Sequence, residues 1–258
     1  MKGFMAILIA ILFIGGAGIL ANSGNKEETR SGQKQEQLLT QQDLENQEQF
    51  LSFVPTEAPD YREVQLSRIS PNSHCEYTIS VLIDRNAYWY YRSLENHDGG
   101  HVEDALCFLN DQYNRRFLGR LSDLFWEKGW ERGQSENEIL LEAISFVQSI
   151  PYEKDIVANG CADHWQYPLE TLYRNQGDCE DHSILLAGLL RELGYDICLI
   201  EFSTHMAVGI LDTGSFSGYY FEYQGNHYYY IETAYSYRDI GEMPDEYIEE
   251  EAEILVLD

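Results

Sequence analysis

Cys179 has the residue type and the position expected of a nucleophile. It opens a stretch in which leucines recur at helical spacing and which Gly194 closes, so the sequence predicts a helix that begins at Cys179. Asp178 is suited to cap this helix, and Asp181 completes a capping-box pair. A cysteine in the first helical turn lies among free N–H groups at the positive end of the helix dipole, which favours a thiolate. The neighbouring carboxylates, including Glu180, act in the opposite direction.

A cysteine nucleophile needs a base to accept its proton and a third group to orient that base. His205 opens a strand soon after the cysteine helix, and Glu232 closes a later strand. If these strands are antiparallel neighbours, both residues lie at the edge of the sheet that faces Cys179. A simple meander over 205–233 would separate them and the triad would fail. We expect an excursion instead, which the hairpin signal Gln224-Gly225-Asn226 allows.

Two other interpretations of the same cysteine are open. Cys179 could be a small buried hydrophobic residue. Alternatively, Cys161-x-x-His164 and Cys179-x-x-His182 have ligand types and spacing that could hold a structural zinc ion. The zinc interpretation requires His182 on the first turn of a helix that is already explained, so we keep it as a minor alternative and expect no metal and no cofactor.

The N-terminal 60 residues differ in character from the rest of the chain. Residues 1–21 carry Lys2 and then an uncharged apolar run, which predicts a signal peptide or a membrane anchor. Residues 22–60 are polar and rich in Gln and Glu, which is typical of a linker. We therefore expect a membrane-anchored or secreted protein whose main domain lies outside the cytoplasm.

The remaining chain predicts helices followed by strands. An extension over 61–134 contains a strand at 75–83, a β-prone run at 88–91 and one helix at 102–126. A core over 135–241 begins with the capping box of Ser135 and Glu138, contains an irregular segment at 152–176, and continues after the cysteine helix with strands at 195–202, 205–211, 219–223 and 228–233. The order predicts an α+β fold with the cysteine helix packed on an antiparallel sheet. Residues 242–258 form an acidic tail whose Ile254–Leu257 end could dock.

Composition excludes some partners. The formal net charge of −27 argues against binding to nucleic acid and against charge-driven binding to anionic lipid. The chain has an odd number of cysteines, Cys75, Cys107, Cys161, Cys179 and Cys198. Their spacing is not the dense spacing of a disulfide-stabilised domain. Oligomeric state is not encoded in any pattern of this chain.

Several motifs, in order, resemble the transglutaminase-like superfamily of papain-fold proteins. They are Tyr167-Pro168-Leu169-Glu170, Gly177-Asp178-Cys179-Glu180-Asp181, His205-Met206-Ala207-Val208 and Tyr230-Ile231-Glu232-Thr233, and the resemblance covers roughly 135–235. It implies a papain-like core in which Cys179 is the nucleophile, His205 the general base and Glu232 the orienting acid. The family usually has Asp in the last position. The backbone N–H of Cys179 would serve the oxyanion hole, with Trp165 or Gln166 as a second donor.

The sequence thus predicts a transglutaminase-like cysteine peptidase or amidase. It would transfer an acyl group from an amide of a peptide or protein substrate through a thioester, with hydrolysis favoured over cross-linking. The alternative is a non-catalytic, peptide-binding or scaffolding module at the cell surface, which the carboxylates around Cys179 and the Glu at 232 also suit.

Overall fold

The computed structural model describes residues 60–71, 76–94, 99–154, 164–235 and 238–257. The predicted N-terminal membrane segment, the linker up to residue 59, Cys75 and Cys161 lie outside these ranges. Among the residues that are described, no helix has the length and apolar character needed to cross a membrane.

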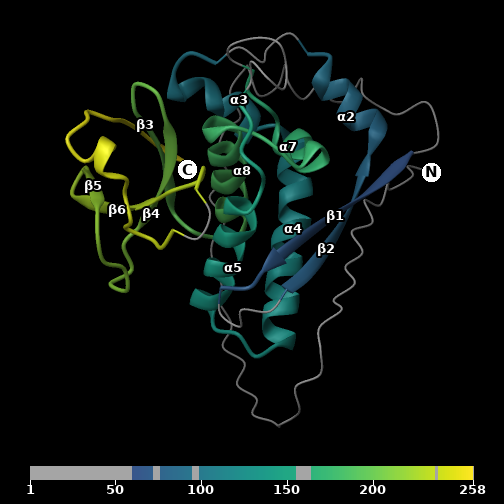
Figure 1. Ribbon diagram of the computed structural model, residues 1–258, viewed down its shortest axis with the longest axis horizontal. Coiled ribbons are helices and arrows are strands. Elements are labelled where there is room, and N and C mark those ends of the chain that lie inside the picture. The colour runs from purple at the N-terminus through teal and green to yellow at the C-terminus, as the bar shows by residue number, and fades with distance from the viewer. Residues whose placement is uncertain (1–59, 72–75, 95–98, 155–163, 236–237, 258) are drawn as a thin grey trace, which may run out of the picture.

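The described chain combines a β-hairpin, a group of helices and a five-stranded antiparallel sheet, which confirms the expected α+β class. Figure 1 shows the hairpin on one side of the helices and the sheet on the other. The sheet order is β5-β6-β4-β3-β7, with every neighbouring pair antiparallel. Its strands are β3 (Ile197–Glu201), β4 (Met206–Leu211), β5 (Tyr220–Tyr223), β6 (Asn226–Ile231) and β7 (Glu253–Leu257). The hairpin is β1 (Tyr61–Ile69) with β2 (Glu76–Asp84), and the helices are α2 (Arg85–Arg92), η1 (Val102–Asp104), α3 (Ala105–Leu109), α4 (Gln112–Glu131), α5 (Glu136–Gln148), α7 (Pro168–Arg174), α8 (Cys179–Glu192) and η2 (Asp245–Tyr247).

Helix α8 is the central element of the fold. It contacts α4, α5 and α7 as well as β3 and β4, and Figure 1 shows it between α4 and the sheet. Every residue from Ser183 to Leu190 is buried, as expected for a helix that is covered on several sides. The predicted capping box is present: the Asp178 carboxylate accepts from the Asp181 N–H, and the Asp181 carboxylate accepts from the Asp178 N–H. The predicted start of this helix at Cys179 is confirmed.

The sheet buries residues on both of its faces, mainly in β3, β4 and β6, whereas the edge strand β5 is largely exposed. Leu199, Val208 and Ile231 pack against the helices, whereas Ile200 and Tyr230 belong to a second cluster on the opposite face. Part of that second face is covered by the chain's own last segment, through Met243, Tyr247 and Ala252. The same segment ends in β7, which pairs with β3 and confirms that the Ile254–Leu257 end docks.

The expected β-run at 88–91 is wrong, because these residues lie in α2. The Asp84 carboxylate caps this helix by accepting from the Asn86 N–H at 2.9 Å. The Tyr91 hydroxyl donates to Asp111 at 2.8 Å, and the Tyr88 ring stacks on Tyr173 with centroids 3.9 Å apart. Tertiary packing of aromatic side chains on a helical face thus overrides their β-propensity.

Other boundaries also differ from expectation. The single helix expected at 102–126 is divided into η1, α3 and α4, because Asp111 caps α4 by accepting from the Asn114 N–H at 2.8 Å. The segment expected to be irregular contains α7, and the available signal was Pro168 at its first turn. Strand β1 was also missed, although Val64 and Leu66 alternate with exposed residues.

Gly177 is required by the close approach of Asp181, and its replacement tests this packing. A Cβ at 177 would lie 2.7 Å from the Asp181 Cβ, so Gly177→Ala is expected to lower the free energy of unfolding by about 1–3 kcal/mol. Urea denaturation measures the change. The matched control is Gly100→Ala, whose Cβ would have its nearest neighbour at 3.8 Å, the Asp104 carboxylate. Equal stability of the two variants would contradict the prediction.

Candidate active site

The pairing of β4 with β6 brings His205 and Glu232 together. Val208 lies opposite Ile231 in an antiparallel register, so the start of β4 meets the end of β6. The His205 Nε2 and Glu232 Oε1 atoms are 3.3 Å apart, and the two residues are 5% and 0% exposed. The predicted antiparallel neighbours are therefore confirmed. Strand β5 forms the expected excursion as a hairpin with β6, turning at Gln224 and Gly225, whose φ angles are +51° and +82°.

The buried Glu232 carboxylate is surrounded by donors. Its Oε1 accepts from the backbone N–H groups of Thr233 and Ala234 at 2.9 and 2.8 Å, and its Oε2 accepts from the Tyr230 hydroxyl at 2.7 Å. Burial acts to raise the pKa of Glu232, but the hydrogen bonds and the charge of His205, together with Tyr230 and Ala234, outweigh it and lower the pKa. The carboxylate is therefore ionised at neutral pH. The Gln148 side chain donates to the Glu232 carbonyl at 2.9 Å and holds its backbone in place.

Cys179 lies at the start of α8, beside the residue that follows His205. The backbone N–H of Met206 hydrogen-bonds the Cys179 sulfur, and the thiol donates to the Glu180 carboxylate at 3.0 Å. Burial, and then the charge of Glu180, raise the pKa of the Cys179 thiol. The resting sulfur is thus a neutral thiol. The expected effect of the helix dipole is outweighed by burial and by the neighbouring carboxylates.

Two residues in the next turn of α8 fasten the helix to the sheet. The Ser183 hydroxyl donates to the Met206 carbonyl at 2.9 Å and lies 2.9 Å from the Thr233 hydroxyl. The His182 Nδ1 lies 3.2 Å from the Thr233 carbonyl. Met206 and Thr233 directly follow His205 and Glu232, so these bonds set the distance from the cysteine helix to both. Our sequence reasoning missed Ser183, although its position one helical turn after Cys179 was a usable signal.

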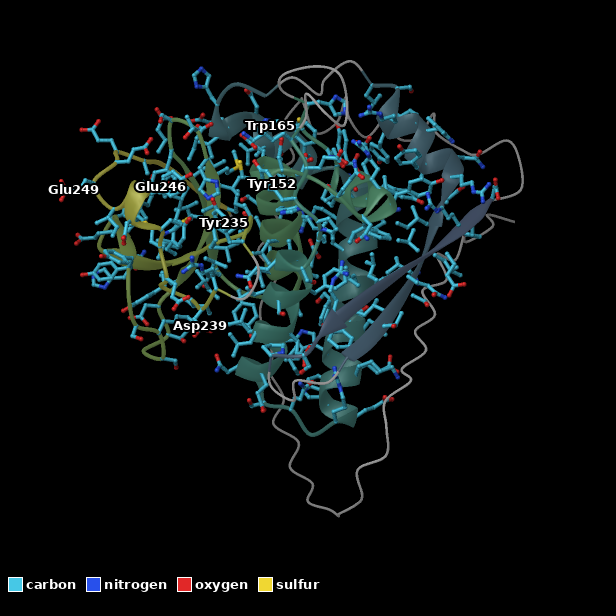
Figure 2. The ribbon with its side chains drawn as sticks, viewed as in Figure 1. Tyr152, Trp165, Tyr235, Asp239, Glu246 and Glu249 are labelled. Carbon is cyan, nitrogen blue, oxygen red and sulfur yellow. The ribbon has the colours of Figure 1, made fainter. Side chains whose placement is uncertain are left out.

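Aromatic and acidic side chains surround this junction. The Tyr247 ring stacks on the His205 imidazole with centroids 4.8 Å apart and planes 13° apart. Burial, followed by Glu246, raises the pKa of Tyr247 to about 12. Partial burial also raises the pKa of Tyr152, which is 44% exposed. Figure 2 shows Tyr152, Tyr235 and Trp165 around the junction of helices and sheet, with Glu246 and Glu249 farther out on the sheet side.

The two residues considered as second oxyanion donors differ in their contacts. Both the backbone N–H and the side-chain amide of Gln166 donate to the Asp181 carboxylate, the former at 2.7 Å. Gln166 therefore stabilises the first turn of α8, and its backbone N–H and side-chain amide are already used as donors to Asp181. Trp165 is 3% exposed and packs against Phe108 and Gly99. The Trp165 role stays a prediction.

The zinc alternative depends partly on Cys161, which lies outside the described residues. Within those residues, no group of three or more His, Cys, Asp or Glu side chains is arranged to hold a metal ion. His182 is fully buried and its Nδ1 faces the Thr233 carbonyl, which gives it a structural contact.

Comparison with solved structures finds chains of low similarity to this one. The solved structure of Legionella pneumophila LapG, described as calcium-bound, shares 15% identity with a TM-score of 0.35, and the similarity covers 66% of this chain and 87% of LapG. A TGase structure shares 12% identity with a TM-score of 0.28; the similarity covers 73% of this chain and 52% of the TGase, so the chain spans about half of that protein. No family model and no curated protein sequence matches this chain. Because both TM-scores are below 0.5, the function proposed below depends on the contacts of this chain itself.

Glu180 is expected to suppress the reactivity of the cysteine. Because its charge and hydrogen bond raise the pKa of Cys179, Glu180→Gln should lower that pKa and increase the rate of alkylation by iodoacetamide at pH 7 about 10-fold. Peptide mass spectrometry measures the rate at Cys179 specifically. The matched control is Glu246→Gln, an exposed carboxylate on η2. An unchanged or slower rate in Glu180→Gln would contradict this assignment.

His182 is expected to make stability dependent on pH. Burial lowers its pKa to about 4, so between pH 6.5 and 4 the unfolded chain binds more protons than the folded one. Stability therefore falls as the pH drops through this window, by up to about 3 kcal/mol from this group. His182→Asn, which keeps a donor near the Nδ1 position, should lose less stability between pH 7 and 4 than the wild type in urea titrations. His101→Asn, at an exposed position, is the matched control, and identical pH profiles for all three proteins would refute the role of His182.

Proposed function

We propose that this protein performs cysteine-dependent acyl transfer on amide bonds, with Cys179 as nucleophile, His205 as general base and Glu232 as orienting acid, on a transglutaminase-like, papain-like core. One observation carries the proposal. The buried His205–Glu232 pair lies where β4 begins, and the Cys179 sulfur accepts a hydrogen bond from the backbone N–H of Met206, the residue after His205. These contacts support a site in which a nucleophile, a base and an oriented carboxylate come from three separate elements.

The hydrogen bonding of the pair supports an assignment of roles. Nε2 of His205 faces the ionised Glu232 and so carries its proton there, which leaves Nδ1 as the basic nitrogen. When substrate binds, Nδ1 accepts the thiol proton as the Cys179 sulfur attacks the carbonyl carbon. The resulting oxyanion is stabilised by the Cys179 backbone N–H. The tetrahedral intermediate expels the amine, which takes the proton from the imidazolium, and a thioester remains.

Water resolves the thioester in the reaction that we favour. His205 removes a proton from water, the hydroxide adds to the thioester carbonyl, and the carboxylic acid leaves as the sulfur recovers its proton. An amine in place of water would give a new amide, so hydrolysis and cross-linking differ only in the acceptor. A peptide or protein is the proposed substrate. The segment 1–21, as a signal peptide or anchor, would place this activity outside the cytoplasm.

A second candidate function is a non-catalytic peptide-binding module. The raised pKa of the Cys179 thiol and its hydrogen bond to Glu180 favour this function, because both oppose a reactive resting sulfur. In this case the site would hold a peptide without breaking a bond.

Acylation by p-nitrophenyl acetate separates the two functions. We expect the wild type to release p-nitrophenol and to carry an acetyl group on Cys179, and it should also cleave members of a fluorescence-quenched peptide library. Cys179→Ala should abolish both activities, and His205→Ala should lower them at least about 100-fold because the thiol loses its base. Cys198→Ala is the matched control, since Cys198 is also a buried thiol but lies in β3.

The opposite outcome is equally specific. If Cys179 is never acylated in the wild type, while library peptides bind the wild type and Cys179→Ala with the same affinity, the protein is a binding module and the proposed reaction is wrong.

A further inference from the structure

Tyr230 contacts both members of the buried pair. It lies in β6, two residues before Glu232 on the same face of the strand, and is 0% exposed. Its hydroxyl donates to Glu232 Oε2 at 2.7 Å, and its oxygen lies 3.4 Å from His205 Nε2. Tyr230 therefore contacts both Glu232 and the ring nitrogen of His205 that Glu232 itself contacts.

The positions of the protons follow from these contacts. An ionised carboxylate only accepts hydrogen bonds, so the Tyr230 proton must be directed at Glu232. The lone pairs of the Tyr230 oxygen then remain to accept a bond from His205. Both Glu232 Oε1 and the Tyr230 oxygen are thus acceptors that face Nε2, and this arrangement stabilises the imidazole tautomer with hydrogen on Nε2.

We propose that Tyr230 is a positioning residue, which holds Glu232 and fixes His205 in the tautomer whose free lone pair is on Nδ1. This inference rests on the proposed function, because Nδ1 is the nitrogen that would accept the Cys179 proton. Removing the hydroxyl leaves Glu232 Oε2 without its donor and removes one of the two acceptors at Nε2. The tautomer without a proton-accepting Nδ1 then becomes more populated.

Tyr230 also provides a reason why a Glu can occupy this position. A Glu side chain has one more torsion than an Asp, so its carboxylate needs more contacts to be held in one orientation. Thr233 and Ala234 bind Oε1 through their backbone N–H groups, and Tyr230 binds Oε2. Each carboxylate oxygen is thereby fixed from a different direction.

The other groups around His205 are the same in the wild type and in a hydroxyl-deletion variant. They are the Tyr247 and Phe202 rings, which stack on the imidazole with centroids 4.8 and 6.3 Å away, and the Glu250 carboxylate, whose pKa is lowered mainly by hydrogen bonds from Ser203. Tyr230→Phe leaves all of these side chains and the ring packing of β6 in place. A change in the behaviour of His205 in that variant is then due to the hydroxyl.

The test compares Tyr230→Phe with Tyr228→Phe. Tyr228 is a second buried tyrosine on the same face of β6, two residues farther from Glu232. The readouts are the ¹⁵N NMR spectrum of His205, the rate of Cys179 acylation by p-nitrophenyl acetate between pH 5 and 9, and thermal stability. We expect Tyr230→Phe to shift His205 away from the Nε2–H tautomer and to slow acylation about 10-fold or more across the pH range, with KM for a cleaved library peptide unchanged. Tyr228→Phe should retain the wild-type tautomer and rate.

Each outcome decides a different question. A wild-type His205 that already has hydrogen on Nδ1, or a Tyr230→Phe variant with wild-type tautomer and rate, would overturn the role of Tyr230. If Tyr230→Phe and Tyr228→Phe lose stability and rate in parallel, the hydroxyl is structural and the inference also fails. If the wild type is never acylated, the proposed reaction is wrong, yet the ¹⁵N spectra still show whether Tyr230 sets the tautomer.

Discussion

The candidate site depends on how the first two turns of α8 are seated against the sheet. Helix α8 provides Cys179, whereas His205 and Glu232 lie at the ends of strands. The bonds of Ser183 to the Met206 carbonyl and the Thr233 hydroxyl join the helix to both strand ends. All of these groups are buried, so each bond forms away from competing water and has few alternative partners.

The buried groups at this contact differ in their charge states, as the pKa shifts of Glu232 and Cys179 show. Burial of a carboxylate is costly, and Glu232 stays ionised because several donors surround it. The Cys179 thiol has a carboxylate neighbour instead, and its pKa is raised. In a chain of net charge −27, a preformed thiolate would add one more buried negative charge. In the reaction proposed above, activation would therefore come from proton transfer to His205, so the orientation of that imidazole would be decisive.

The parts of the fold that were predictable from sequence are those with strong local signals. The helix at Cys179 has a capping box and an apolar period, and the chain after Gly194 consists of short β-prone runs with a hairpin signal at Gly225, so both were predicted correctly. Helix α2 was mistaken for a strand because its tyrosines pack on tertiary partners that no local pattern reveals. The candidate residues Cys179, His205 and Glu232 followed from their order in the chain. Ser183 and Tyr230 did not, because a hydroxyl in a buried helix or strand shows its partner only once the sheet register is known.

The last segment of the chain links the site to the sheet edge. Strand β7 pairs with β3, and this pairing carries 242–251 across the second face of the sheet. Ser203 donates to Glu250 from both its backbone N–H, at 2.8 Å, and its hydroxyl, which fixes the segment next to the turn that precedes His205. Tyr247 is thereby placed on the imidazole ring. The His205 ring thus contacts Glu232 and Tyr230 at its edge and Tyr247 on one face. Together these contacts restrict rotation of the imidazole. A base restrained in this way keeps Nδ1 in one place, which a buried and protonated thiol requires if it is to lose its proton to that atom.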